Sequence, residues 1–449
     1  MIWVKNLDLT KDPLPHLLKK IAIPASIGMF FNTMYYIVDN YYAGLLSSTA
    51  LAGLSLAAPI YFMGIAVSIG IGQGTNALVG NSRGEGRQDL AEEIAGRALS
   101  FAWLTAILIG LTVLFFVTDL FSVMGAEGAY VNDAVSYLSI ILPTLALSAH
   151  AMAANGILNS LGDTTSFRNS LIVAFFANIL LDPLFMFTFG WGVYGLAAAT
   201  ATTQLGSAIY LTKKVSQSQL AACLSSHNLS PNLVQYRALI NQSLPASTNM
   251  FLIALGSIIV TAAVSRFGED AVAGLGIALR IEQLVLLPTV GINIAVLSLV
   301  SVNFGAKKFE RMEKVAVDSI RIGTIMMVFG GILVFAFARP LIALFTDDSN
   351  VIEIGVGYLR VEALILPAYV LSFVSSAVLQ GMKQAVVPMY FNLVRQLILP
   401  SLFIAVALIL LDTDIFGIWW SIAIASWLTV TLQFQHMRKT VKKTVLASL

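Results

Sequence analysis

The sequence has few charged residues and a single cysteine. Asp, Glu, Lys and Arg make up 11% of its 449 residues and 57% are hydrophobic, whereas soluble domains carry about 25% charged residues. A soluble globular domain is therefore excluded, and an all-α polytopic membrane protein is predicted. Cys223 alone cannot form an internal disulfide or a cysteine metal cluster. The histidines are scattered along the chain, so we expect neither a metalloenzyme nor a cofactor.

Long apolar runs are interrupted by short segments, and these runs predict twelve membrane spans of about 20 residues each. The spans begin near residues 17, 50, 91, 131, 167, 194, 238, 271, 314, 351, 385 and 415. Lys and Arg collect at both ends of the chain and after even-numbered spans, while the segments after odd-numbered spans hold only Arg266 and Arg339. Because basic segments stay in the cytoplasm, both termini are predicted to be cytoplasmic. No signal-peptide cleavage pattern follows the first span, so we expect this span to be retained.

The chain repeats itself at an offset of 221 residues. This shift places Pro24-Ala25-Ser26 on Pro245-Ala246-Ser247, and Met29-Phe30 on Met250-Phe251. Two halves with six spans each enter the membrane in the same orientation, which predicts parallel, pseudo-symmetric lobes with a substrate region in a V-shaped cleft. The predicted domains are an N-lobe of residues 1–215, a cytoplasmic linker of residues 216–236 and a C-lobe of residues 237–449.

An acid lies inside the first span. A charge in the hydrocarbon layer costs about 2.5–3.5 kcal/mol on insertion scales, so such a residue is a functional hypothesis. Asn32, Tyr35 or Tyr36, and Asp39 recur at helical spacing and predict one polar face. Asp39 maps onto Val260 in the second half, so the repeat itself does not require the acid. Solvation at the headgroup level is the structural alternative. Pro24 predicts a kink in the same span.

The fifth span carries a second acid. Asn178 and Asp182 lie four residues apart, and Pro183 leaves the carbonyl of Ile179 without its helical donor. Such a group suits a proton, a water or a small cation, although hydrogen bonding between helices is an alternative role. Counting from the neighbouring turns places Asp39, Asp182 and Thr200 at a common depth of about 12–15 Å. We therefore expect these three side chains to meet.

The second half holds charges of both signs within its spans: Arg280, Glu282, Arg360, Glu362 and Arg395. The first four balance in sign at a similar depth, which favours a structural cluster of ion pairs, and substrate binding is the alternative. Span 7 contains no acid. Glu282 and Glu362 remain as candidates for a site in the C-lobe.

These features resemble the multidrug and toxic compound extrusion (MATE) family, in particular its prokaryotic branch related to DNA-damage-inducible protein F. The resemblance covers the whole chain through the twelve spans, the proline and aspartate of span 1, and the N-x-x-x-D-P motif of span 5. It implies export of drugs and organic cations, coupled to inward flow of protons or sodium. It also implies a monomer in the inner membrane of a prokaryote, with no cofactor and no nucleic-acid partner.

The resemblance also implies which residues act. The coupling site would be Asp39, Asn178, Asp182 and Thr200, which could also hold Na⁺. The surrounding cavity network would contain Asn32, Tyr35, Tyr137 and Asn155. Independently of the resemblance, Pro24 weakens span 1, so we expect it to act as a conformational hinge that lets the span bend inward when a proton replaces a cationic substrate.

Two other functions compete with this interpretation. A lipid-linked sugar flippase of the same superfamily would favour a cavity with many cations and often extra spans, whereas only Arg280, Arg360 and Arg395 are available. An intramembrane prenyl transferase would need paired acidic motifs for magnesium at a membrane face, and the sequence has none.

Overall fold

The computed structural model describes residues 7–447, and this part of the chain contains helices and no strand. Both chain ends, predicted to be cytoplasmic, lie outside the described residues. The first six spans are α1 (Leu14–Leu46), α2 (Ser48–Gly84), α3 (Gln88–Val123), α4 (Ala129–Ser160), α5 (Thr165–Pro183) with η1 (Leu184–Thr188), and α6 (Gly192–Ser216). Short helices η2 (Ala221–Leu224) and α7 (Ser226–Leu229) follow.

The last six spans are α8 (Leu233–Val264) with η3 (Ser265–Phe267), α9 (Glu269–Gly305), α10 (Phe309–Ala343), α11 (Ser349–Gly381), the interrupted α12 (Val386–Leu393), η4 (Val394–Ile398), α13 (Leu399–Ala405) and η5 (Val406–Leu410), and α14 (Ile415–Leu446). Eleven spans within residues 7–447 are long and apolar enough to cross a membrane. The twelfth, α6, is 25 residues long but less apolar, since it carries Thr202, Gln204 and a basic last turn. The prediction of twelve helical spans is confirmed.

The internal repeat is visible in the helix boundaries. Adding 221 to the bounds of α2, Ser48–Gly84, gives 269–305, which are the bounds of α9. The same shift moves the start of α3 at Gln88 onto Phe309 and the start of α5 at Thr165 onto Val386. The repeated sequence therefore encodes repeated helices.

The chain divides into two compact units, each described by itself. One contains Ile27–Ser247, and the other contains Asp8–Ser26 and Thr248–Leu449. The start of α1 thus belongs to the second unit and the start of α8 to the first. Each boundary lies shortly after the proline of a Pro-Ala-Ser repeat. The sequence-defined lobes, residues 1–215 and 237–449, stay a prediction.

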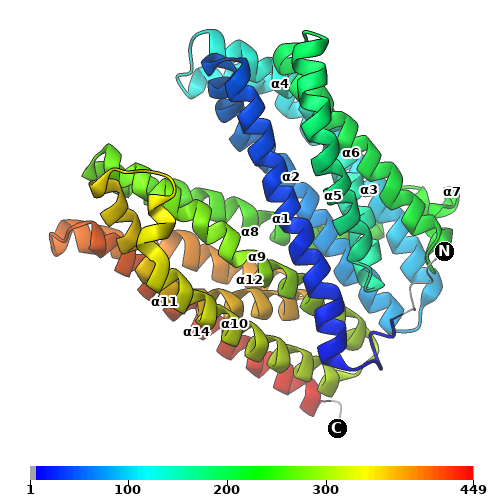
Figure 1. Ribbon diagram of the computed structural model, residues 1–449. Coiled ribbons are helices and arrows are strands. Elements are labelled where there is room, and N and C mark those ends of the chain that lie inside the picture. The colour runs from blue at the N-terminus through cyan, green and yellow to red at the C-terminus, as the bar shows by residue number, and fades with distance from the viewer. Residues whose placement is uncertain (1–6, 448–449) are drawn as a thin grey trace. The chain divides into compact units, whose positions relative to one another are not determined.

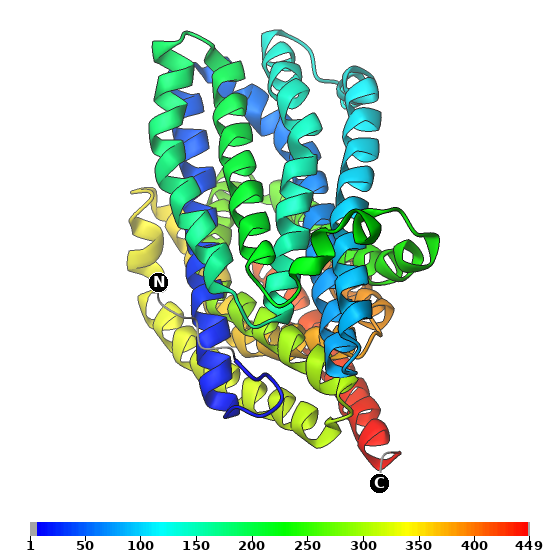
Figure 2. The same cartoon turned by 90° about the vertical axis from the view of Figure 1, so that its right-hand side faces the viewer.

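The first unit is built around α2 and α4, which pack closely because glycines of α2 face α4. A methyl group on Gly72 would press on the carbonyl of Met152, and one on Gly64 would overlap Leu145. Glycine at a helix crossing lets the backbones approach in a membrane protein. In Figure 2 the cyan and green helices of this unit lie side by side, and α7 contacts α3.

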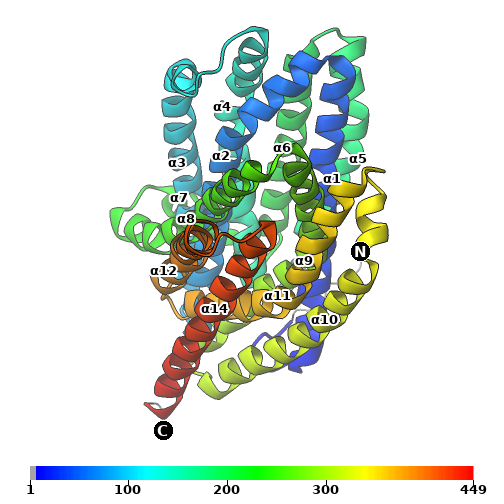
Figure 3. The ribbon, with the colours of Figure 1, turned by 90° about the vertical axis from the view of Figure 1, so that its left-hand side faces the viewer.

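The second unit repeats this arrangement around α9 and α11, with α10 and α14 packed on them. These four helices are labelled in Figures 1 and 3. Residues before α1 are held against the same unit, since Asn303 donates its side-chain amide to the carbonyl of Leu9 at 3.1 Å and Lys308 donates to the carbonyl of Thr10 at 3.1 Å.

Candidate functional site

Two carboxylates meet inside the first unit. Asp39 on α1 is 5% exposed and Asp182 at the end of α5 is 0% exposed. The two acids interact electrostatically with each other, and Asn178 lies against both. The depths of both acids were counted from the turns that follow their helices. These turns are present: α1 ends at Leu46, and Gly190, in the left-handed conformation, follows α5 and η1.

The hydrogen bonds of this cluster are incomplete. Asn178 Nδ2 donates to Asp182 Oδ1 at 2.9 Å. Asp39 Oδ1, Asp182 Oδ2, Asn178 Oδ1 and Thr200 Oγ1 are buried and have no hydrogen-bond partner among the described residues. Buried polar atoms normally have a partner, so each exception calls for an explanation. Four oxygens with unused lone pairs suit a proton or a hard cation.

Among residues 7–447 no group of three or more His, Cys, Asp or Glu side chains is placed to hold a metal ion. Two carboxylates together with amide and hydroxyl oxygens fit a monovalent cation such as Na⁺, or a shared proton. These are the four residues that the family resemblance implies for the coupling site.

A tyrosine network adjoins the carboxylates. Tyr35 OH lies 2.8 Å from Thr203 Oγ1, which donates to the carbonyl of Thr200 at 2.9 Å, so Tyr35 is the donor to Thr203. Both Tyr35 and Tyr137 interact electrostatically with Asp39. These two tyrosines were expected near the site.

Other members of the network were not expected from the sequence. Tyr61 on α2 packs edge-on against Tyr36 and Tyr137, with ring centroids 6.3 Å and 6.4 Å away. Gln204 Nε2 donates to Tyr61 OH at 3.2 Å. Thr203 and Gln204 follow Thr200 closely on α6, and this spacing could have indicated that they belong to the network. Nothing in the local pattern of α2 marks Tyr61.

The carbonyl freed by Pro183 is not unpaired, and this expectation was wrong. Tyr42 OH donates to the Ile179 carbonyl at 3.2 Å. Tyr42 lies three residues after Asp39 and therefore faces the same side as the acid. After Pro183 the helix widens into the π-helix η1, in which Phe189 N bonds to Leu184 O. Such π-segments are frequent at functional sites.

Two asparagines named from the sequence occupy different places. Asn32 interacts with Tyr36 and so belongs to the tyrosine network. Asn155 lies eighteen residues after Tyr137 on the continuous helix α4, a separation of about 27 Å along the axis. Asn155 is therefore outside the carboxylate cluster.

The predicted cluster of ion pairs in the second unit is also wrong. Glu282 accepts hydrogen bonds from Tyr358 OH at 2.6 Å and Tyr369 OH at 3.3 Å. No ion pair joins Arg280, Glu282, Arg360 or Glu362 among the described residues. Residues two apart on a helix point to different faces, so the basic member of each pair is exposed while its acid faces inward.

Arg395 supplies the positive charge near the two acids of the second unit, of which Glu282 is partly buried and Glu362 is buried. It interacts electrostatically with Glu282 and Glu362, and its guanidinium lies 5.3 Å from the centroid of the Tyr369 ring. Glu362 is 2% exposed, and both its carboxylate oxygens lack a hydrogen-bond partner among residues 7–447. The second unit thus has a mixed acid–base cluster where the first has only acids.

Comparison with known proteins identifies the family. The MatE family model matches residues 24–184 and 245–406, once in each half. The chain is 27% identical over 322 residues to the probable multidrug resistance protein YoeA of Bacillus subtilis, covering 69% of this chain and 68% of that protein. It is 24% identical to the multidrug export protein MepA of Staphylococcus aureus, covering 92% and 91%.

A solved structure has the same fold. It is a multidrug resistance MATE family transporter of the MOP superfamily in an outward-facing conformation, with a TM-score of 0.92 and 23% identity, and the match covers 99% of each chain. The two family matches together span most of the twelve helices. The chain therefore belongs to the MATE family of membrane transporters.

Proposed function

We propose that this chain is a secondary active exporter of small organic compounds, many of them cationic, driven by inward flow of protons or sodium. The observation that carries the proposal is the buried pair Asp39 and Asp182. Asp39 Oδ1 and Asp182 Oδ2 have no hydrogen-bond partner among the described residues. The names of YoeA and MepA support drug export. We place the transporter in the inner membrane of a prokaryote as a monomer with cytoplasmic termini.

The coupling follows from charge. Two carboxylates close together in a medium of low dielectric cannot both stay ionised without a compensating positive charge. A proton or Na⁺ held by Asp39, Asn178, Asp182 and Thr200 would supply this charge. A cationic substrate bound near these acids would compete for the same negative potential. Binding of the coupling ion would therefore expel the substrate, and the two would cross the membrane in opposite directions.

Pro24 is the proposed hinge of α1. It lacks the backbone donor of a helical residue, and it lies close to the point where α1 passes from one contact unit to the other, between Ser26 and Ile27. A bend there would move the polar face that carries Tyr35 and Asp39. Glu282 and Glu362 are kept as a candidate second ion site, with Arg395 as their counter-charge.

Efflux from proteoliposomes tests the proposal. Purified protein is reconstituted with an entrapped fluorescent organic cation, and efflux is followed after a pH gradient or a sodium gradient is imposed. We expect efflux with one of the two gradients, and its loss to background in Asp39→Asn and Asp182→Asn, because the amide keeps the shape but cannot bind a proton or balance a cation. Pro24→Ala should slow efflux without abolishing it.

Asp119→Asn is the matched control, since Asp119 is an exposed acid near the end of α3 in the same unit. It should leave efflux unchanged. Gradient-driven efflux at the wild-type rate in Asp39→Asn, with normal protein incorporation, would overturn the role assigned to the acid. Efflux in wild type with neither gradient would overturn secondary transport.

A further inference from the structure

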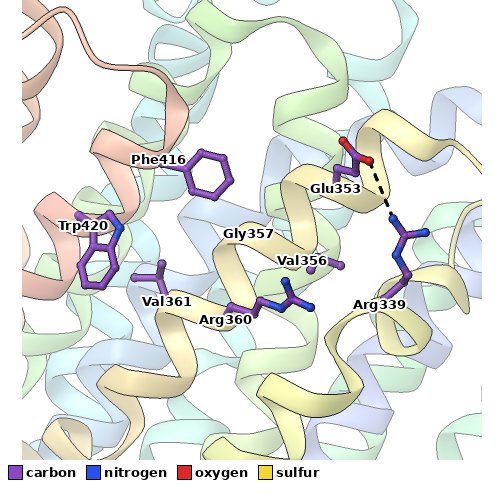
Figure 4. Close-up of a pocket in the computed structure, with 8 residues that line it drawn as sticks. All are labelled: Arg339, Glu353, Val356, Gly357, Arg360, Val361, Phe416 and Trp420. Carbon is purple, nitrogen blue, oxygen red and sulfur yellow. Dashed lines mark ion pairs between the residues drawn. The ribbon is translucent and has the colours of Figure 1, made fainter.

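A groove on the second unit is not used by the proposed transport mechanism. It has a volume of about 520 Å³ and lies between α10, α11 and α14. Figure 4 shows the three charged side chains and two aromatic rings that surround it. Its lining residues are Arg339, Glu353, Val356, Gly357, Arg360, Val361, Phe416 and Trp420.

The charges of the groove are not mutually satisfied. Arg339 Nη2 and Glu353 Oε1 are 3.9 Å apart, at the limit of an ion pair, and both side chains are more than 60% exposed. Arg360 is exposed and forms no ion pair with a described residue. Its guanidinium lies 5.4 Å from the centroid of the Phe335 ring. The groove therefore carries a net positive charge and one arginine without a carboxylate.

The depth of Arg360 makes this charge unusual. Helix α11 has 33 residues and is about 50 Å long, so it extends beyond a hydrocarbon layer of about 30 Å. If the excess is shared between both ends, Arg360, eleven residues after Ser349, lies about 6 Å inside the hydrocarbon boundary. An arginine at this depth extends its guanidinium towards the phosphates of the bilayer.

The residues that line the groove around Arg360 are suited to an amphiphilic ligand. Glu353, Gly357 and Arg360 follow one another at helical spacing along one face of α11, so the groove runs from the headgroup level inward. Phe416 and Trp420 lie one turn apart on α14 and form its aromatic wall. Aromatic side chains of this kind are enriched at membrane interfaces.

We propose that this groove binds a membrane phospholipid from the leaflet that surrounds the start of α11. The phosphate accepts hydrogen bonds from Arg360 and Arg339, whose planar guanidinium groups match a phosphate in a bidentate manner. The part of an acyl chain nearest the headgroup lies along Val356, Val361 and Trp420. The lipid supplies the anion that Arg360 lacks within the protein.

Native mass spectrometry of delipidated protein tests this proposal, with dioleoylphosphatidylglycerol as the probe. Arg360→Met should weaken its binding by about tenfold or more, the equivalent of about 1.4 kcal/mol, and Arg360→Lys should recover part of the affinity. Arg266→Met is the matched control, because Arg266 is an exposed arginine in η3, outside the groove. Diolein, which has the same chains without the phosphate, should bind at least about tenfold more weakly.

Equal binding of the lipid to wild type and Arg360→Met, with Arg339→Met also without effect, would overturn the proposal. Diolein binding as tightly as the phospholipid would show an apolar groove only. Inorganic phosphate that displaces the lipid at equal concentration would show a site for a free anion instead. Because none of these readouts involves transport, failure here is independent of the exporter proposal.

Discussion

Tyr42 replaces, from another helix, the hydrogen bond that Pro183 removes from α5. The sequence predicts that the Ile179 carbonyl lacks its helical donor, but it does not predict which side chain replaces that donor. This choice depends on how α1 is rotated against α5, and sequence periodicity defines a polar face only to within a turn. The Ile179 carbonyl, which was expected to bind an ion, therefore accepts a hydrogen bond from Tyr42 instead.

Tyr42→Phe tests this assignment. Removing the hydroxyl leaves a partly buried carbonyl without a donor, which should lower the free energy of unfolding by about 1 kcal/mol. Tyr41→Phe is the control, since Tyr41 is 63% exposed and adjacent in the chain. The midpoint of thermal unfolding in detergent measures both. A fall of the same size in Tyr41→Phe would contradict the assignment.

The depth of a residue along its helix could be predicted from the sequence. Which neighbouring helix its side chain contacts could not. From residue counts to the neighbouring turns we expected Asp39 and Asp182 to meet, and the two side chains do interact. The same counting wrongly paired Glu282 with an arginine, because equal depth does not bring two side chains to one face. Tyr61 was missed because it lies in an apolar helix with no polar repeat.

At the scale of helices, close crossings depend on single glycines. Gly291 on α9 lies against Ser26 and the carbonyl of Ala22 on α1, and the repeat-related Gly70 on α2 lies against Ser247 and the carbonyl of Ser243 on α8. Repeated glycines and repeated Pro-Ala-Ser segments in the sequence predict equivalent helices. They do not reveal that each proline-containing segment packs in the unit opposite to the rest of its helix.

Gly291→Ala should disrupt its crossing. The added methyl group meets backbone and hydroxyl atoms, and overpacking of this kind costs about 1–3 kcal/mol. Gly276→Ala on the same helix is the control, because nothing lies within 4 Å of its added carbon. It should leave stability unchanged or raise it by up to about 1 kcal/mol. Thermal unfolding in detergent distinguishes them, and equal effects of the two variants would contradict the packing argument.

Helix boundaries were predictable because apolar runs and turn residues change together along the chain. The π-helices were not, since these segments differ from α-helix only in backbone hydrogen bonding, and two of the three within residues 7–447 are Leu184–Thr188 and Val394–Ile398. Both follow or precede a proline by a few residues. One adjoins Asp182 and the other contains Arg395, whereas the third π-helix, Val406–Leu410, holds no charged residue.

At the scale of the whole molecule, the halves share their helices and differ in charge. Asp39 and Asp182 both lie in the first unit, and the repeat places Val260 of the second unit at the position equivalent to Asp39. In the second unit, partly buried Glu282 and buried Glu362 lie near Arg395. A duplicated frame with one acid-only cluster fits a transporter in which one half binds the coupling ion.

The predicted orientation in the membrane is open to a labelling test. Cys223, the single cysteine, is buried, so background labelling should be low. Asp89→Cys and Asp119→Cys place an exposed thiol at opposite ends of α3. A membrane-impermeant maleimide added to intact cells should label Asp119→Cys alone, and both variants after permeabilisation. Labelling of only Asp89→Cys in intact cells would reverse the topology.

Charge movement after an ion concentration jump tests the central claim most directly. Proteoliposomes on a solid-supported membrane are exposed to a rapid change in pH or in Na⁺ without substrate, and the transient current reports binding of the ion. We predict a transient in wild type and in Asp119→Asn, and its loss in Asp39→Asn and in Asp182→Asn, because the two acids bind the ion together. A transient of wild-type size in the Asp39→Asn Asp182→Asn double variant would contradict the account.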